Sequence, residues 1–108
     1  DAPVTLLNPR RRNYPWDDPA AAEEQIRWEF RHLRRATAVA FWFPPETLCP
    51  IALFELGGRI AEPTQTLFVG THPDYARRLD VQIQLKLARP EVAVAGDIPA
   101  LAAQVRAW

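Results

Sequence analysis

Two patterns of apolar residues alternate along the chain. Short, continuous apolar runs occur at residues 4–7, 37–43, 66–70 and 91–95, and the stretches between them repeat apolar residues at every third or fourth position. A continuous run is typical of a strand covered on both faces, and the three-to-four spacing is typical of an amphipathic helix. The sequence therefore predicts four strands that alternate with helices.

Most of the predicted helices begin with a capping residue or a proline. Asp17-Asp18-Pro19 predicts the start of the first helix, Pro50 that of the second, and Asp97 with Pro99 that of the last. Thr71-His72-Pro73-Asp74 predicts that the third helix opens directly after the strand at residues 66–70. The buried stripe of this third helix is expected to consist of Ala76, Leu79, Ile83 and Leu87.

Strands that alternate with helices form βαβ units, in which the strands are parallel and the crossovers are right-handed. We therefore expect an α/β fold, a three-layer, doubly wound parallel sheet of the flavodoxin or Rossmann type with about four to five strands. Ligands bind to such sheets at the carboxyl ends of the strands. Three loops follow strands at that edge, at residues 8–16, 44–50 and 70–74.

The composition narrows the functional classes. The 108 residues suffice for one domain, and 48% of them are hydrophobic. Thirteen basic residues balance thirteen acidic ones, so charge supplies no argument for a nucleic-acid or membrane-surface partner.

Cys49 is the single cysteine, which excludes an internal disulfide, and no ligand cluster around it indicates a metal. We expect a cytoplasmic protein, because no apolar stretch approaches the ~18 residues of a membrane span. Its arginine-rich composition is that of a GC-rich bacterial genome.

One acid, Glu55, lies among Leu53, Phe54 and Leu56 in the second predicted helix. Apolar neighbours raise the pKa of a carboxyl group, whereas a helix N-terminus lowers it. A partly desolvated but ionised carboxylate is a competent nucleophile toward the anomeric carbon of a sugar. Position alone favours a glutamate whose charge reaches solvent, because most helix glutamates are solvated.

Four stretches carry a resemblance to a known family: "VTLLNPRR", "IRWEFRHLRRA", "FWFPPETLCPIALFELG" and "VGTHPDYARRLDVQIQLKLARP". They are similar to the nucleoside 2-deoxyribosyltransferase-like proteins, a bacterial branch of the nucleoside 2-deoxyribosyltransferase superfamily. The resemblance implies that the glutamate before Leu/Ile-Gly attacks C1′ of a deoxynucleoside, expels the base and forms an ester that a second base or water resolves. Glu55-Leu56-Gly57 matches that motif.

The resemblance also implies roles for other residues. Glu55 takes the position of the nucleophile, and Glu46 is the loop acid that would assist it, although its spacing from Glu55 is unusual for the family. Glu29 matches an acid on the preceding helix that helps to hold the base, but it could instead pair with arginines of its own helix. The resemblance implies no metal and no organic cofactor.

Further candidates lie at the same edge or on the third helix. Asn8 and Arg10 could hold a 5′-phosphate or a sugar hydroxyl, and a solvated basic loop explains them equally well. Phe43 could stack on a base or belong to the core. Asp80, which shares a helix face with Gln84, could line the pocket or a subunit contact. The expected substrate contacts are Asn8, Arg10, Glu29, Phe43, Pro44, Thr47 and Asp80.

Three nearby residues have reactive side chains but simpler interpretations. His72 and Asp74 could serve acid–base chemistry, although Thr-His-Pro-Asp indicates helix capping first. Cys49 before Pro50 is expected to be a small apolar residue at a helix start, because no histidine is paired with it.

The chain departs from the family in one respect. Family members begin with a strand and a glycine-containing loop that wall the base pocket, whereas this sequence opens on the equivalent of the second strand. We therefore expect residues 1–108 to form a single domain that is N-terminally incomplete. A homo-oligomer, a dimer or larger, is also expected. The alternative to an enzyme is a non-catalytic nucleotide-binding or protein-interaction module with the same fold.

Overall fold

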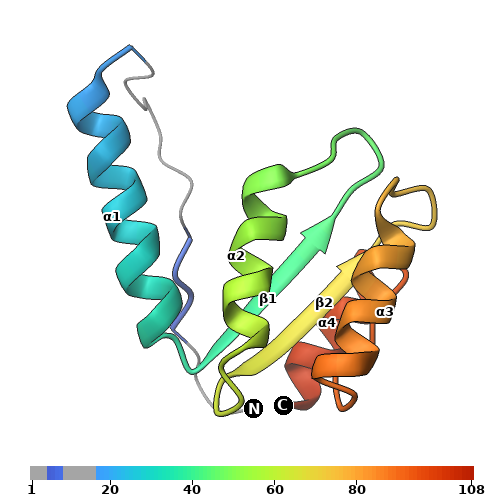
Figure 1. The fold of residues 1–108 in the computed structure, drawn as a ribbon. Coiled ribbons are helices and arrows are strands. Elements are labelled where there is room, and N and C mark those ends of the chain that lie inside the picture. The colour runs from blue at the N-terminus through green and yellow to red at the C-terminus, as the bar shows by residue number, and fades with distance from the viewer. Residues whose placement is uncertain (1–4, 9–16) are drawn as a thin grey trace. The chain divides into compact units, whose positions relative to one another are not determined.

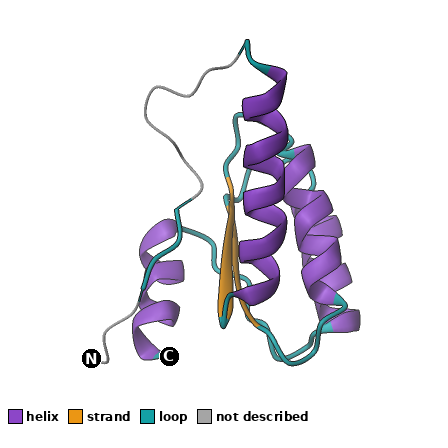
Figure 2. Ribbon diagram, turned by 90° about the vertical axis from the view of Figure 1, so that its left-hand side faces the viewer, coloured by secondary structure: helices purple, strands orange, loops and turns teal. Residues whose placement is uncertain are grey.

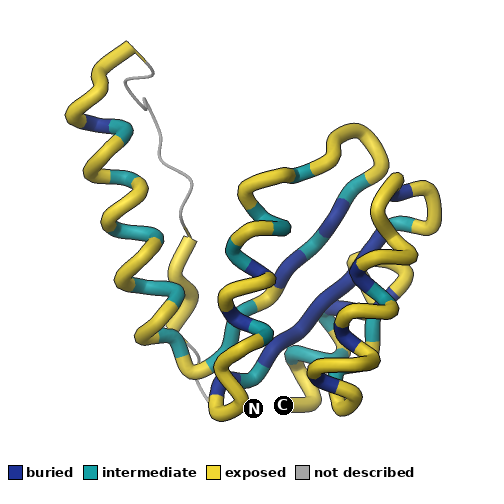
Figure 3. Tube along the Cα trace, in the orientation of Figure 1, coloured by how far each residue is buried: buried dark blue, intermediate teal, exposed yellow. Residues whose placement is uncertain are grey.

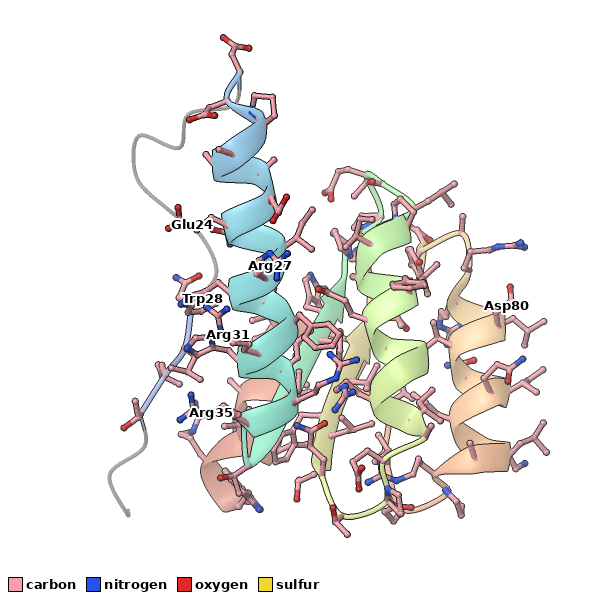
Figure 4. The ribbon with its side chains drawn as sticks, turned by 60° about the vertical axis from the view of Figure 1, so that its left-hand side comes forward. Glu24, Arg27, Trp28, Arg31, Arg35 and Asp80 are labelled. Atoms are coloured by element: carbon pink, nitrogen blue, oxygen red, sulfur yellow. The ribbon has the colours of Figure 1, made fainter. Side chains whose placement is uncertain are left out.

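The structure, a computed structural model, describes residues 5–8 and 17–108. The chain divides into two compact units, residues 1–36 and 37–108. The first contains α1, Pro19–Arg35 (Figure 1), and it begins as predicted: the Asp18 side chain accepts a 3.0 Å hydrogen bond from the Ala20 amide. This bond satisfies one of the free amides of the first turn. One side of α1 carries Glu24, Arg27, Trp28, Arg31 and Arg35 (Figure 4).

The second unit is built on a parallel pair of strands, β1 (Ala38–Phe43) and β2 (Thr66–Thr71), joined by the crossover helix α2 (Pro50–Ile60). The register places Ala38 opposite Thr66 and Phe43 opposite Thr71. The remaining helices are α3 (Arg78–Ala88) and α4 (Ile98–Ala107). The predicted α/β class and parallel pairing are confirmed, and α2 and α4 begin at the predicted prolines or caps.

Two of the four predicted strands are wrong. Residues 5–7 lie outside any strand, and Val4 lies outside the described residues. Of residues 91–95, only Ala95 pairs, in a parallel bridge to Gly70: its amide donates to Val69 O and its carbonyl accepts from the Thr71 amide, both at 2.9 Å. A strand needs a neighbouring strand to pair with its backbone groups along its length, and within residues 5–8 and 17–108 only Ala95 of these two segments pairs with a strand.

Different helices cover the two faces of the sheet. On one face, the strands pack with α2 and α3 in a core made of Phe41, Phe43, Leu56, Leu67, Val69, Tyr75, Val81 and Leu85. α4 lies on the opposite face of the sheet (Figure 2), where its Leu101 packs with Phe68 and Ala95. Consecutive strand residues alternate between these cores, as the pleat requires. Every residue of β2 after Thr66 is buried (Figure 3), so this strand is covered on both sides.

The third helix differs from the prediction. It begins at Arg78 rather than at residues 71–74, because the Asp74 amide donates to His72 Nδ1 at 3.0 Å and closes a turn instead of a helix. The predicted stripe is also wrong. Val81 and Leu85 are the buried residues of α3, whereas Leu79, Ile83 and Leu87 are exposed.

Two buried arginines form hydrogen bonds at the amino-terminal edge of the sheet. Arg89, after α3, donates to Glu62 O at 3.1 Å, to Gln65 O at 2.8 Å and to Glu91 Oε2 at 2.6 Å. Arg59, at the end of α2, donates to Gln65 Oε1 at 3.2 Å. The loop between α2 and β2 is thereby bonded to the ends of both helices. Among the described residues, no helix is both long enough and apolar enough to cross a membrane.

Candidate functional site

The carboxyl ends of β1 and β2 are followed by two loops that are bonded to each other. The His72 amide donates to Phe43 O at 2.9 Å, and the Tyr75 hydroxyl donates to Leu48 O at 2.6 Å. The first bond continues the strand pairing one residue beyond β2, and the second connects segments that are 27 residues apart. The loop that precedes α2 is therefore held in place by the loop that precedes α3.

Cys49 turns the chain from this loop into α2. Its backbone is left-handed, with φ 52° and ψ 56°, and it is the one non-glycine residue with positive φ within residues 5–8 and 17–108. Its amide donates to Thr47 Oγ1 at 3.3 Å, and Pro50 then occupies the first turn of the helix. A left-handed residue costs backbone energy outside glycine, so the surrounding contacts must hold this turn.

The chemistry of Cys49 agrees with its predicted role as a small apolar residue. Burial, and then the negative charge of Glu46, raise the pKa of the Cys49 thiol, while its hydrogen bond with Thr47 lowers it. The raised pKa keeps the sulfur protonated, and a thiol is a weaker nucleophile than a thiolate. Carboxylates are therefore the candidates for nucleophilic chemistry in this segment.

Glu55 lies in the second turn of α2 and is half-buried. The next residue, Leu56, is 3% exposed and belongs to the core, and Ala52 and Leu53 pack against the same core. The helix dipole acts mainly within the first turn, so it contributes little at Glu55. Glu55 therefore lies at the border of the apolar face of α2 as a partly exposed residue.

Glu46 is exposed in the loop between β1 and α2. Its charge acts on the Cys49 thiol, which places it in the same electrostatic surroundings as the start of α2. Glu46 therefore lies in the loop that leads into the helix carrying Glu55.

The other predicted contacts of the second unit have distinct surroundings. Phe43 is fully buried and stacks on Tyr75, with 5.1 Å between ring centroids, so its ring belongs to the core. Pro44 is half-buried, and Thr47 is exposed with its hydroxyl on the Cys49 amide. Asp80 is exposed on the outer side of α3 (Figure 4) and pairs with Arg77 at 3.4 Å.

The candidates of the first unit stay predictions. Asn8 is exposed, and Arg10 lies outside the described residues. Glu29 is half-buried on α1, where its carboxylate accepts a 3.1 Å hydrogen bond from Gln25 Nε2. The alternative interpretation of Glu29 was an ion pair with arginines of its own helix. The hydrogen-bond partner of its carboxylate is instead Gln25, one turn earlier on α1.

The comparison with protein families gives a match for residues 1–75, to the family described as "Nucleoside 2-deoxyribosyltransferase like". The chain belongs to this family. The matched residues include the loop after β1, all of α2 and β2, and the Glu55-Leu56-Gly57 motif. Membership in the nucleoside 2-deoxyribosyltransferase-like family confirms the predicted resemblance and implies a nucleoside as the bound substrate class. No curated protein matches the chain.

Two residues of this edge gained importance only from the structure. Thr71, the last residue of β2, is 1% exposed, and its hydroxyl has no hydrogen-bond partner within the described part of the chain. Tyr75 bonds the two loops and anchors the core. The sequence offers a weak signal for each of them. Thr71 is a polar residue at the end of an apolar strand, and Tyr75 is an aromatic residue beside a turn that contains proline.

Proposed function

We propose that this member of the nucleoside 2-deoxyribosyltransferase-like family cleaves or transfers the N-glycosidic bond of a (deoxy)nucleoside or nucleotide, with Glu55 as the nucleophile. One observation carries the proposal: the family match includes Glu55, and this residue lies half-buried on the helix that follows the carboxyl end of β1. Ligands of parallel α/β sheets bind at that edge.

The proposed reaction is a double displacement. A carboxylate oxygen of Glu55 forms a bond to C1′ while the bond from C1′ to the base nitrogen breaks, and the electron pair of that bond leaves with the base. A nitrogen of a second base, or a water oxygen, then attacks C1′ and releases the carboxylate. Two displacements at one carbon retain the anomeric configuration, as in retaining glycosidases.

Glu46 is proposed as the auxiliary acid and base. Protonated, it would donate its proton to the departing base; ionised, it would accept a proton from the incoming nucleophile. Its position in the loop that leads into the helix carrying Glu55 supports this role, because an acid–base group must come within reach of the reacting atoms. Pro44 and Thr47 of the same loop are proposed to border the sugar.

The proposal is tested by incubating the full chain with a deoxynucleoside and a different free base and separating the products by chromatography. Exchange of the base is expected, or release of free sugar if water is the acceptor. With the first substrate alone, intact mass spectrometry should show the protein plus one deoxyribosyl group, and peptide mapping should place that group on Glu55. A label on another residue would exclude Glu55 as the nucleophile.

The second candidate function is a non-catalytic nucleotide-binding or protein-interaction module. One observation favours it: among the described residues, β1 has a paired neighbour on one edge only, so no described strand walls the other side of the site. Calorimetry with nucleosides and nucleotides distinguishes the two. Binding without turnover supports the module, and turnover supports the enzyme.

A further inference from the structure

His72 is the first residue after β2, and its ring closes the turn that follows. The Asp74 amide donates a 3.0 Å hydrogen bond to His72 Nδ1. A backbone amide can only donate, so Nδ1 must present its lone pair to that amide. A neutral imidazole that accepts at one nitrogen carries its proton on the other. The turn therefore selects the tautomer of His72 that is protonated at Nε2.

The second histidine of the chain has the opposite arrangement. Nδ1 of His32 lies 2.7 Å from the backbone oxygen of Trp28. A carbonyl oxygen can only accept, so Nδ1 of His32 carries a proton. The sequence contains two histidines, and their hydrogen bonds require different protonation at Nδ1. His32 therefore provides an internal reference for the tautomer of His72.

The Nε2–H group of His72 is the donor that this turn leaves accessible. The amides of residues 71–75, apart from the proline, donate to acceptors of the chain at 2.9–3.0 Å. The Tyr75 hydroxyl donates to Leu48 O. The Thr71 hydroxyl has no partner within the described residues, but Thr71 is 1% exposed and out of reach of a ligand. His72 is half-buried, and none of the described residues bonds to its Nε2.

His72 lies at the edge of the sheet where ligands of this fold bind. The register pairs the last residues of β1 and β2, so His72 follows β2 at the level at which Pro44 follows β1. Pro44 begins the loop that is proposed to border the sugar. Both strands end at this edge (Figure 1), and ligands of parallel α/β sheets bind there. A donor of fixed direction at this edge suits an acceptor atom of the ligand.

The proposed reaction indicates which acceptor atom this is. Glu55 attacks C1′, so the base departs from the opposite side of C1′. Val69 of β2 packs with α2 in the core, and side chains alternate along a strand, so the side chain of His72 starts from the face of the sheet opposite α2. The electron pair of the broken bond spreads onto the atom beside the glycosidic nitrogen, which is N3 in a purine and O2 in a pyrimidine. A positioned N–H donor at that atom stabilises the developing charge.

We propose that the Nε2–H group of His72 donates a hydrogen bond to the acceptor beside the glycosidic nitrogen of the base, N3 of a purine or O2 of a pyrimidine. The identity of the ligand rests on the proposed function, whereas the tautomer of His72 rests on the turn alone. His72 is then a substrate-binding residue rather than an acid–base group or a helix cap, and proton transfer stays with Glu46.

Nuclear magnetic resonance tests the tautomer in the free protein. Long-range correlations between the carbon-bound ring protons and the ring nitrogens show which nitrogen carries a proton. In a mildly alkaline buffer, His72 should be protonated at Nε2 and His32 at Nδ1, and His32→Asn assigns the two sets of signals. A His72 ring protonated at Nδ1 overturns the proposal.

Base exchange by the full chain tests the contact with the ligand. His72→Asn keeps the turn, because an asparagine oxygen accepts from the amide two residues later, but it leaves the position of Nε2 empty. The variant should exchange the base of deoxyadenosine about 10- to 100-fold more slowly, the value of one hydrogen bond to a group that becomes charged. Its rate with 3-deazadeoxyadenosine, which lacks N3, should equal that of wild type. The 7-deaza analogue retains N3 and is the matched control, so it should lose the same factor as deoxyadenosine.

The outcomes separate this contact from the proposed reaction. If only pyrimidine nucleosides are exchanged, the 2-thio analogue replaces the 3-deaza analogue, because sulfur is a weak acceptor. An equal loss with every analogue overturns the contact while the reaction stands. If the chain binds nucleosides without exchange, the reaction is wrong, and calorimetry makes the same comparison: a loss of affinity for deoxyadenosine but not for the 3-deaza analogue supports the contact. A chain that binds none of these nucleosides overturns both.

Discussion

The hydroxyl group of Tyr75 donates a 2.6 Å hydrogen bond to the backbone carbonyl of Leu48, and the ring of the same residue stacks on Phe43. One side chain thus connects the core below the sheet edge to the loop that starts α2. Because Glu55 lies on α2, the position of the proposed nucleophile depends on this bond.

Removing only that hydroxyl tests the connection. Tyr75→Phe keeps the ring and its stacking, so the expected loss of stability is about 1 kcal/mol, the usual value of one hydrogen bond, measured by urea unfolding. The loosened loop should lower the rate of base exchange while leaving the fold intact, as judged by circular dichroism. Unchanged stability and unchanged exchange would together show that the bond does not matter.

The titration of Tyr75 provides a pH test. Burial, and then the neighbouring Cys49, raise the pKa of the Tyr75 phenol above its ordinary value. The folded state therefore favours the protonated phenol, and its stabilising effect is present below the pKa of an unfolded tyrosine, about 10, and is lost as the pH rises through the folded value. The difference in ultraviolet absorbance between wild type and Tyr75→Phe should show a phenolate that appears only above about pH 10.

At the opposite edge of the sheet, substitution of Arg89 should cause the largest loss of stability. It is 6% exposed and donates to two backbone carbonyls and to Glu91. Arg89→Ala removes a donor from both carbonyls and leaves Glu62 O with the Gln65 amide, so we expect a loss of about 2–4 kcal/mol in chemical unfolding. Arg77→Ala, which removes an exposed ion pair with Asp80, is the control and should cost less than about 1 kcal/mol.

Alanine substitution at Gly70 and at Gly58 should change the stability of the chain in opposite directions. A Cβ on Gly70 would lie 2.9 Å from Cε3 of Trp42, so Gly70→Ala forces the indole to move and should destabilise the chain by about 1–3 kcal/mol. The smaller side chain of Trp42→Leu in the same molecule should relieve part of that penalty. Gly58→Ala meets no atom within 4 Å in a helix and should stabilise by about 0.5–1 kcal/mol. Thermal unfolding distinguishes the two directions.

Substitutions of the two carboxylates proposed for catalysis should affect base exchange in different ways. Glu55→Gln removes the nucleophile and should abolish exchange with every leaving base. Glu46→Gln removes proton transfer, which is worth about 10²–10⁴-fold, and should slow substrates with poor leaving groups more than substrates with good ones. Equal losses across leaving groups for Glu46→Gln would argue against its role as an acid.

Local hydrogen bonding made the helix starts at Asp18 and Asp97 predictable. Each carboxylate accepts from an amide two or three residues later, at 3.0 Å from Ala20 and 2.7 Å from Ala100, so the bond is local and can be read from the sequence. The same reasoning failed at residues 71–74, because His72 used its ring nitrogen to close a turn on the Asp74 amide.

The buried face of α3 could not be chosen from sequence because the helix has two apolar stripes. Val81 and Leu85 have helical spacing, as do Leu79, Ile83 and Leu87, and periodicity alone ranks the longer stripe first. The contact of Tyr75 with Phe43 and the later helix start at Arg78 instead direct Val81 and Leu85 toward the sheet. For the candidate site, the motif located Glu55, but its half-buried position depends on tertiary packing.

The packing of α2 on the sheet has a consequence for how this lineage can change. A helix turns by about 100° for each residue, so one residue inserted or deleted between Leu53 and Leu56 would rotate Glu55 away from its present direction relative to the core. A length change in the loop before Cys49 leaves that relation intact, because the same apolar residues still hold the helix on the sheet. The first two turns of α2 are therefore the place where descendants would most readily lose the chemistry while keeping the architecture.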